Sequence, residues 1–231
     1  MNSEIERLNF IPNYLNENDF ELYLDSKKYD ILLHKSELEF LVKICDYVNN
    51  KKLHGDVVEC GVWKGGSAVL LSILLNRNEF CSIRNFWLAD YFGSFYNFNS
   101  EIMMPKEYDT FTKVSKLKIS PPTLDEVKLF IGSFNLSIRN FKFLIGDVRN
   151  TLEHSEIQDI FLLHLDLDFY DSTIHALEVL YPKVLEGGII LINDYNVNNL
   201  NCKEAILKFK KDNNISNPII EIGRYMAYWI K

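Results

Sequence analysis

The stretch LLHLDLDFYDSTIHALEVLYPKVLEGGIILINDY, residues 162–195, determines the fold class of this chain. A leucine-rich run at 162–167 and an isoleucine-rich run at 189–192 predict two buried strands, and the segment between them predicts a crossover helix. Nearly continuous apolar runs are typical of parallel strands that helices cover on both faces. A strand, a helix and a second strand in this order bring both strand ends to one edge of a sheet. The stretch therefore predicts a doubly wound α/β sheet.

Polar side chains accompany both runs toward this edge. His164, Asp166 and Asp168 recur at every second residue, which places them on one face of the strand. Asn193 and Asp194 end the second run. Two carboxylates and an amide oxygen, from Asp166, Asn193 and Asp194, are hard donors that suit Mg²⁺, whereas no Cys or His cluster has zinc spacing. We predict a magnesium site; the alternative is that these residues only solvate strand ends, where Asp and Asn are common.

The composition favours a single soluble α/β domain. The chain has 231 residues, of which 47% are hydrophobic and 13% aromatic, enough for one substantial core. Its net charge of −7 argues against a nucleic-acid partner, because such binding rests on neutralising phosphates with Lys and Arg. No C-x-x-C pair, signal peptide or apolar run long enough to span a membrane is present. We expect a cytoplasmic protein with no membrane partner.

Strands and helices alternate along the rest of the chain. Further strands are predicted at 56–59, 86–89 and 141–145, and a terminal antiparallel hairpin is predicted at 218–222 and 224–230. Helices are predicted around 68–75 and 205–209, and from Ser36 and Thr123, each followed three residues later by a glutamate as in a capping box. The pattern predicts a mostly parallel seven-stranded sheet in a domain at 55–231, preceded by an N-terminal helical extension at 1–54.

The parallel strands end in polar side chains, so we expect one shared ligand site at that edge. These side chains are Glu59, Asp90, Asp147, Asp166, and Asn193 with Asp194. The first strand enters the loop VVECGVWKGGS, residues 57–67, where Gly61 permits a tight turn and Ser67 can cap the next helix. The dinucleotide fingerprint G-x-G-x-x-G is absent. The loop suits a ligand with an amino acid and a ribose, because Asp90 can accept hydrogen bonds from the ribose hydroxyls. The alternative is a structural turn that binds no ligand.

Segments in matching order resemble the TylF/macrocin O-methyltransferase family. They are GDVVECGVWKGGS (55–67), LADYFG (88–93), GDVRNTL (146–152), LDLDFYDST (165–173), LYPKVLEGG (180–188), INDY (192–195) and CKEAILKF (202–209). The resemblance implies a class I methyltransferase with a Rossmann-like sheet, which uses S-adenosylmethionine and Mg²⁺ to methylate a hydroxyl, typically of a natural-product sugar. The chain departs from the family where Asn193 replaces an aspartate and where the Gly-Leu-Pro turn after Asp90 is missing.

The resemblance also implies roles for individual residues. S-adenosylmethionine contacts are implied at Glu59, Gly61, Val62, Trp63, Ser67, Asp90 and Asp147, the last of these near the adenine, and metal ligands at Asp166, Asn193 and Asp194. A sulfonium methyl is a good electrophile, so the enzyme has to orient the acceptor oxygen and remove its proton. We expect Asp166 to be the general base and His164 to be a second candidate. The alternative for His164 is a satisfied place in the interior.

The segment at 91–122 is rich in aromatic residues and contains Lys106, Lys113, Lys116 and Lys118 in an acidic chain. We predict a lid over the site whose lysines hold the phosphates of a nucleotide-linked sugar. Packing of the aromatic residues against the core is the alternative. We expect a sugar or nucleotide-sugar substrate and a homo-oligomer. A phenol or catechol acceptor is the second possibility, and a non-catalytic nucleotide-binding module is the alternative of another class.

Overall fold

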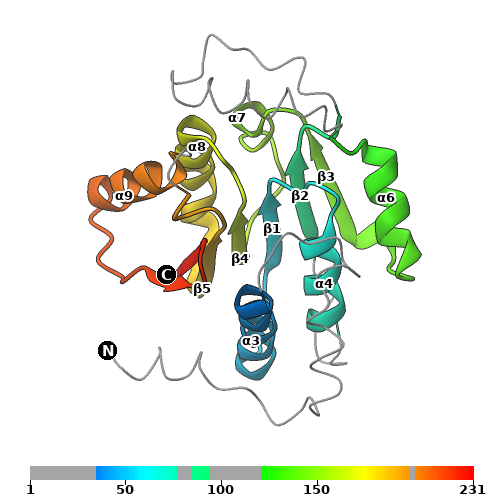
Figure 1. Ribbon diagram of the computed structural model, residues 1–231, viewed down its shortest axis with the longest axis horizontal. Helices are drawn as coiled ribbons and strands as arrows, with labels where there is room; N and C mark the ends of the chain where they lie inside the picture. Colours follow the sequence, from blue (N-terminus) through cyan, green and yellow to red (C-terminus); the bar gives the residue numbers. More distant parts are fainter. Residues whose placement is uncertain (1–34, 77–84, 94–120, 198–200) are drawn as a thin grey trace.

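The computed structural model describes residues 35–76, 85–93, 121–197 and 201–231, in which strands and helices alternate (Figure 1). The strands are β1 (Asp56–Cys60), β2 (Phe86–Asp90), β3 (Phe141–Ile145), β4 (Ile160–Leu165), β5 (Val184–Ile192), β6 (Ile220–Ile222) and β7 (Met226–Ile230). The helices are α3 (Lys35–Lys51), α4 (Gly66–Leu75), α6 (Leu124–Ser133), α7 (Val148–Thr151), α8 (Tyr170–Leu180) and α9 (Cys202–Asp212), with short 3-10 helices η3 (Ile138–Asn140) and η4 (Tyr181–Lys183).

The strands form one seven-stranded sheet in the order β3-β2-β1-β4-β5-β7-β6. Strands β1 to β5 pair in parallel, whereas β7 pairs antiparallel with both β5 and β6. This arrangement confirms the predicted doubly wound, mostly parallel sheet with a terminal antiparallel hairpin. The strand order reverses between β1 and β4, and in open α/β sheets ligands bind outside the carboxyl ends of the strands at such a point. In Figure 1 the arrowheads of β1 and β2 point toward the edge where α7 lies.

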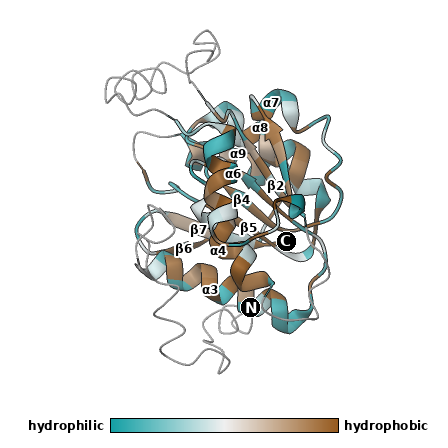
Figure 2. Ribbon diagram, turned by 90° about the vertical axis from the view of Figure 1, so that its right-hand side faces the viewer, coloured by the Kyte–Doolittle hydropathy of each residue, from teal (hydrophilic) through white to brown (hydrophobic). Residues whose placement is uncertain are grey.

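Helices cover both faces of the sheet. One face packs against α3, α4 and α6, with Leu71 and Ile131 in its core. The other face packs against α7, α8 and α9, with Leu177 and Ile206 in its core. Figure 2 shows the hydrophobic colour on the strands that lie between these helices. Because the central strands are buried on both faces, their polar side chains can meet a ligand only near the strand ends.

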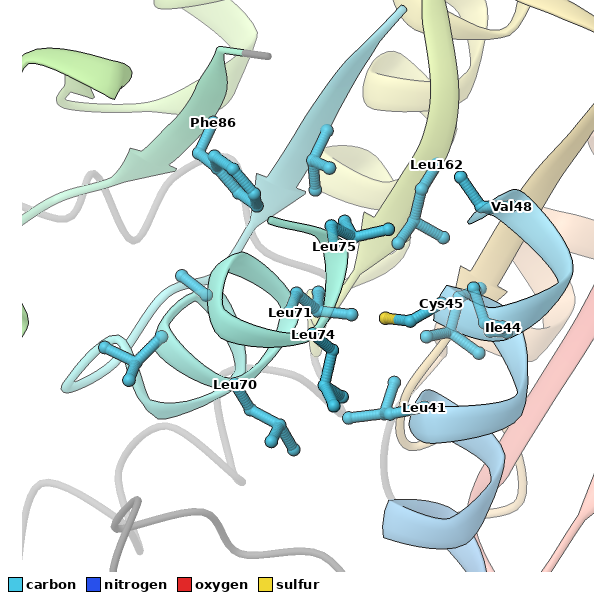
Figure 3. Packing of buried hydrophobic residues seen from close by; sticks show 14 of the residues in the cluster. Leu41, Ile44, Cys45, Val48, Leu70, Leu71, Leu74, Leu75, Phe86 and Leu162 are labelled. Carbon is cyan, nitrogen blue, oxygen red and sulfur yellow. The ribbon is translucent and has the colours of Figure 1, made fainter. Parts of the chain in front are cut away.

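Helices α3 and α4 pack against each other beside the sheet (Figure 3). Leu41 and Cys45 of α3 lie beside Leu71 and Leu74 of α4, and none of the four is more than 3% exposed. The helix predicted in this region is therefore confirmed, and it shares its core with the sheet. The predicted division between residues 54 and 55 stays a prediction, because residues 1–34 lie outside the described part of the chain.

A buried carboxylate joins α3 to the terminal hairpin. Glu37 is 1% exposed, and its Oε1 atom accepts the backbone N–H of Tyr225 at 3.0 Å and that of Arg224 at 3.3 Å. Gly223 precedes them with a φ of 59°, and a Cβ atom there would lie 2.8 Å from the Ser36 hydroxyl oxygen. The turn between β6 and β7 therefore rests on the first turn of α3, which holds the hairpin beside β5.

Capping explains one helix start and not another. The Thr123 hydroxyl accepts the backbone N–H of Glu126, and the Glu126 carboxylate accepts the N–H of Thr123, so the predicted capping box of α6 is confirmed. Helix α3 begins at Lys35, so Ser36 lies inside its first turn and not before it.

The predicted extent of β4 was wrong. The strand ends at Leu165, so Asp166 and Asp168 lie in the loop that follows and not on the strand itself. Pairing with β1 and β5 also stops at Leu165. The alternation of polar and apolar residues nevertheless continues past the strand end, because Leu167 still packs against the core formed with α7, α8 and α9.

The described part of the chain has buried cysteines and only short or polar helices. Cys45, Cys60 and Cys202 are free and buried, while Cys81 lies outside the described residues. Within residues 35–76, 85–93, 121–197 and 201–231, no helix is long and apolar enough to cross a membrane.

The buried charge of Lys210 on α9 lowers the stability of the fold. It is 8% exposed, its ammonium nitrogen lies 4.7 Å from the centre of the Trp229 ring, and it has no hydrogen-bond partner among the described residues. Burial lowers the pKa of Lys210 to about 8. We expect Lys210→Met, which keeps the length and removes the charge, to stabilise the protein by about 1 kcal/mol near pH 7 and to raise its Tm by about 2–4 °C.

The pH dependence of this gain has a definite sign. Between about pH 8 and 10.5 the unfolded chain binds more protons than the folded one, so the parent gains stability as pH rises. The difference in stability between Lys210→Met and the parent therefore becomes smaller at high pH. Calorimetry near pH 7 and near pH 10 measures the difference, with the exposed neighbour in Lys211→Met as control. A gain that is the same at both pH values, or the same for Lys211→Met, would contradict the assignment.

Candidate functional site

Backbone hydrogen bonds continue past the strand ends and align the loops that follow. The N–H of Asp166 donates to the carbonyl oxygen of Cys60 at 2.8 Å, and the N–H of Asn193 donates to that of Leu165 at 2.9 Å. The loops after β1, β4 and β5 therefore begin side by side. We call residues 61–66 the glycine loop and residues 166–169 the carboxylate loop.

Gly61 is the point where these two loops meet. Its N–H donates to the carbonyl oxygen of Ala89 at 2.9 Å, which ties the glycine loop to β2. Its φ is +86°, and a Cβ atom at this position would lie only 2.0 Å from the carbonyl oxygen of Asp166. No side chain fits between the two backbones, so glycine is required here for both reasons.

Asp90 holds the glycine loop in place. Its Oδ2 atom accepts the backbone N–H of Val62 at 2.7 Å and that of Trp63 at 3.0 Å, while Oδ1 accepts the N–H of Tyr91 at 2.6 Å. Trp63 has a φ of 48°, a left-handed conformation that a non-glycine residue seldom adopts and that is often found at ligand sites. A carboxylate has about four acceptor positions, so Asp90 can still accept ribose hydroxyls.

Glu59 and His164 form a buried pair on adjacent strands. They stand opposite each other in the register of β1 and β4, and each is at most 1% exposed. His164 Nδ1 lies 3.1 Å from Glu59 Oε1, which also accepts the hydroxyl of Ser67 at the start of α4. Burial is the largest effect and lowers the pKa of His164, but Glu59, the charge of Asp166 and the amide of Asn193 together raise it above its usual value. The structure thus places His164 against Glu59 in the interior.

Acid groups gather around the carboxylate loop. Desolvation and the charge of Asp194 together raise the pKa of Asp166 to about 8 and that of Asp168 to about 7, although the charge of His164 lowers that of Asp166. Burial and the charge of Glu37 raise the pKa of Asp194. Asp168 was not among the predicted site residues, although its spacing after Asp166 could have identified it; the charge of Asp90 also raises its pKa. These groups repel one another unless a proton or a cation lies among them.

Asn193 links the carboxylate loop to the interior pair. Its side-chain nitrogen donates to Asp166 Oδ2 at 3.0 Å. Its amide lies close enough to His164 to raise the pKa of the imidazole, but its buried Oδ1 atom makes no well-aligned hydrogen bond within the described residues. That oxygen therefore keeps a lone pair for a cation or a water molecule.

Among the residues that the structure describes, no three His, Cys, Asp or Glu side chains lie close enough to hold a metal ion. The predicted set has only two carboxylates, Asp166 and Asp194, together with the amide of Asn193. Its donors are all oxygen atoms and its acids repel one another, which fits a hard divalent cation. The metal site stays a prediction.

Asp147 is occupied by side chains of the protein. Its carboxylate accepts the hydroxyl of Tyr91 at 2.9 Å and the Nε–H of Arg149 at 2.9 Å, and it caps α7 through the backbone N–H of Arg149. Hydrogen bonds from Arg149 hold the pKa of Asp147 below its usual range although burial raises it. The predicted contact near adenine involves a group whose orientation is already fixed by Tyr91 and Arg149.

The predicted lid lies largely outside the described residues. Lys106, Lys113, Lys116 and Lys118 all fall within 94–120, so neither the lid nor its alternative is tested. A cavity of about 220 Å³ lies where this segment rejoins the described chain, and its lining includes Lys64 of the glycine loop, Pro122 and Phe130.

The sheet order, the reversal between β1 and β4 and a glycine loop tied to an acid at the end of β2 define a Rossmann-like class I methyltransferase. The family model described as macrocin-O-methyltransferase (TylF) matches residues 30–231, and the chain belongs to this family of enzymes. The resemblance noted in the sequence is therefore confirmed.

Individual relatives share 25–29% of their aligned residues with this chain. The demethyldecarbamoylnovobiocin O-methyltransferase of Streptomyces niveus is 29% identical over 193 residues, which cover 83% of this chain and 72% of that protein. The 8-demethyl-8-(2,3-dimethoxy-alpha-L-rhamnosyl)-tetracenomycin-C 4'-O-methyltransferase of Streptomyces olivaceus is 29% identical over 175 residues, 76% of this chain and 65% of that protein. The solved structure of the O-methyltransferase NovP superposes with a TM-score of 0.74 at 25% identity, covering 85% of this chain and 80% of that one.

The contact at Gly61 gives a direct test of the site geometry. Gly61→Ala should destabilise the protein by more than about 2 kcal/mol in urea unfolding, because the methyl group forces the glycine and carboxylate loops apart. Gly132→Ala, in the exposed part of α6 with nothing within 4 Å of the new atom, should instead stabilise it by about 0.5–1 kcal/mol. Equal effects of the two substitutions would show that the loops do not need this contact.

Proposed function

We propose that this protein transfers the methyl group of S-adenosylmethionine to a hydroxyl group of a sugar, assisted by a divalent cation. The observation that carries the proposal is the junction at Gly61, which sets a loop suited to the methyl donor against a loop rich in acids, in a chain of the macrocin O-methyltransferase family. A methyl donor and an acceptor oxygen have to lie in line and in contact, and adjoining loops at one strand edge provide that geometry.

The glycine loop supports the choice of donor. Its backbone is held open by Asp90 at Val62 and Trp63, and its glycines let a ligand approach the main chain closely. The loop lacks the G-x-G-x-x-G pattern of a pyrophosphate site. Asp90 would accept the ribose hydroxyls, and the segment at Asp147 would border the adenine.

Three side chains would hold the cation. Asp166 and Asp194 offer carboxylates, and Asn193 offers the amide oxygen that has no well-aligned partner. A bound divalent cation would acidify and orient the acceptor hydroxyl. Asp168 lies near enough to Asp194 to feel its charge and could orient waters around the ion.

Proton removal from the acceptor is assigned to Asp166. Its backbone is fixed against the glycine loop and its carboxylate is held by Asn193, so it would face the acceptor in one orientation. His164 is fully buried against Glu59, which supports the interior role for this residue over that of a second base. A group that contacts no acceptor cannot accept its proton directly.

A sugar is favoured as acceptor over a phenol or catechol. The Streptomyces olivaceus relative is named as acting on a rhamnosyl compound, and Lys106, Lys113, Lys116 and Lys118 would suit the phosphates of a nucleotide-linked sugar. A homo-oligomer in the cytoplasm remains our expectation.

The donor and acceptor can be tested together. S-adenosylhomocysteine at about 100 times its Kd should stabilise the protein by about 2.7 kcal/mol and raise its Tm, whereas NAD should leave Tm unchanged. Methyl transfer should be fastest with sugars or nucleotide sugars and slowest with catechols, and the double variant Lys113→Ala, Lys116→Ala should bind nucleotide sugars more weakly than the parent. Stabilisation by NAD alone would overturn the donor, and fastest turnover of catechols would overturn the acceptor.

The cation needs a separate experiment. EDTA should abolish methyl transfer and added Mg²⁺ should restore it, and Asn193→Asp should bind Mg²⁺ more tightly because the substitution adds a charged ligand. Asp166→Ala should slow the reaction by roughly two to four orders of magnitude. Full activity in EDTA would remove the cation from the proposal, while wild-type rates in Asp166→Ala would remove the base.

A further inference from the structure

A series of neighbouring polar side chains, buried at its centre and half-buried at its two ends, crosses the sheet beneath the site. It begins with Ser67 at the start of α4, whose hydroxyl donates to Glu59. Glu59 pairs with His164 at 3.1 Å, the imidazole lies beside the Asn193 amide, and that amide donates to Asp166 at 3.0 Å. The series therefore runs from the glycine loop, through β1, β4 and β5, to the carboxylate loop.

The central pair is unusual for a protein interior. Glu59 and His164 are 1% and 0% exposed, and the face of the sheet on which they lie is otherwise packed with apolar side chains from α3 and α4. Buried ion pairs stabilise a fold no better than apolar residues of similar volume. A fold that needed only stability at these positions would be served by leucine or valine, so the pair calls for another explanation.

We propose that His164 is a positioning residue that couples binding of the methyl donor to binding of the divalent cation. The proposal rests on the proposed function. A donor in the glycine loop orders Ser67 and Glu59, which fixes the imidazole, and the imidazole in turn fixes Asn193 and Asp166. A cation at Asp166 and Asn193 orders the same side chains from the other end. The ligand that binds second finds part of this ordering complete, so each ligand tightens the other.

The experiment measures coupling and not activity. S-adenosylhomocysteine, which lacks the sulfonium charge and so does not repel the ion, is titrated calorimetrically into the protein in EDTA and again in saturating Mg²⁺. We expect Mg²⁺ to tighten S-adenosylhomocysteine binding by about 5-fold or more, within the usual range of coupling between sites. By reciprocity, S-adenosylhomocysteine should tighten Mg²⁺ binding by the same factor.

Two substitutions separate the two ends of the imidazole. His164→Asn places an amide nitrogen near the position of Nδ1 and keeps a partner for Glu59, but it is too short to reach Asn193. His164→Gln places its amide near the position of Nε2. We expect the coupling factor to fall below about 2-fold in His164→Asn and to be partly restored in His164→Gln. His154→Gln, at an exposed position after α7, is the matched control and should keep the parental factor.

Each outcome bears on the proposal. A parent that binds neither S-adenosylhomocysteine nor Mg²⁺ overturns the proposed function and this inference together. A parent that binds both with no coupling, or a His164→Asn variant that keeps the parental coupling, overturns this inference and leaves the proposed function standing. If His164→Asn does not fold, Glu59→Gln cuts the same series at its neighbour and has to lower the coupling factor as well; an unchanged factor there also overturns the inference.

Discussion

The parallel pairing of β1 with β4 is the constraint on which the rest of the site depends. Its register sets Glu59 opposite His164 and carries Gly61 to Asp166 one residue beyond the strands. A shift of one residue would turn every side chain of one strand to the other face of the sheet, so the buried pair and the loop junction exist only in this register. Helices on both faces hold it there, because the two strands contribute apolar side chains to both cores.

The acid side chains of the fold fall into two groups. Glu37 and Asp90 hold backbone N–H groups of neighbouring segments, and Asp147 is satisfied by Tyr91 and Arg149, so these acids organise the chain. Asp166 and Asp194 are instead half-buried and Asp168 is exposed at the carboxylate loop, no Lys or Arg among the described residues forms an ion pair with them, and their pKa values are raised. Acids that organise a fold are satisfied within it, whereas acids that await a ligand are not.

Much of this could be predicted from the sequence, because polar residues that interrupt apolar runs mark where strands end. Strand β3 was predicted with its observed limits, Phe141–Ile145, and the acids at the ends of β1 and β2 were identified. The end of β4 was not, since Leu167 continues the apolar alternation after the ladder has stopped. The pairing of His164 with Glu59 depends on a register between strands that lie about a hundred residues apart, which no local pattern encodes. The link between Asp147 and Arg149 could have been predicted from the sequence, because an N-cap aspartate two residues before an arginine is a local signal.

The close approach at Gly61 also limits how such an enzyme can be altered. Because the two loops share a backbone contact with no room for a side chain, they behave as one rigid block, and neither can be lengthened or re-aimed without the other. Attempts to evolve a new acceptor preference on this scaffold would therefore find tolerated changes in the walls around the block, for example near Pro122, Val127 and Phe130, while the block itself is inherited unchanged.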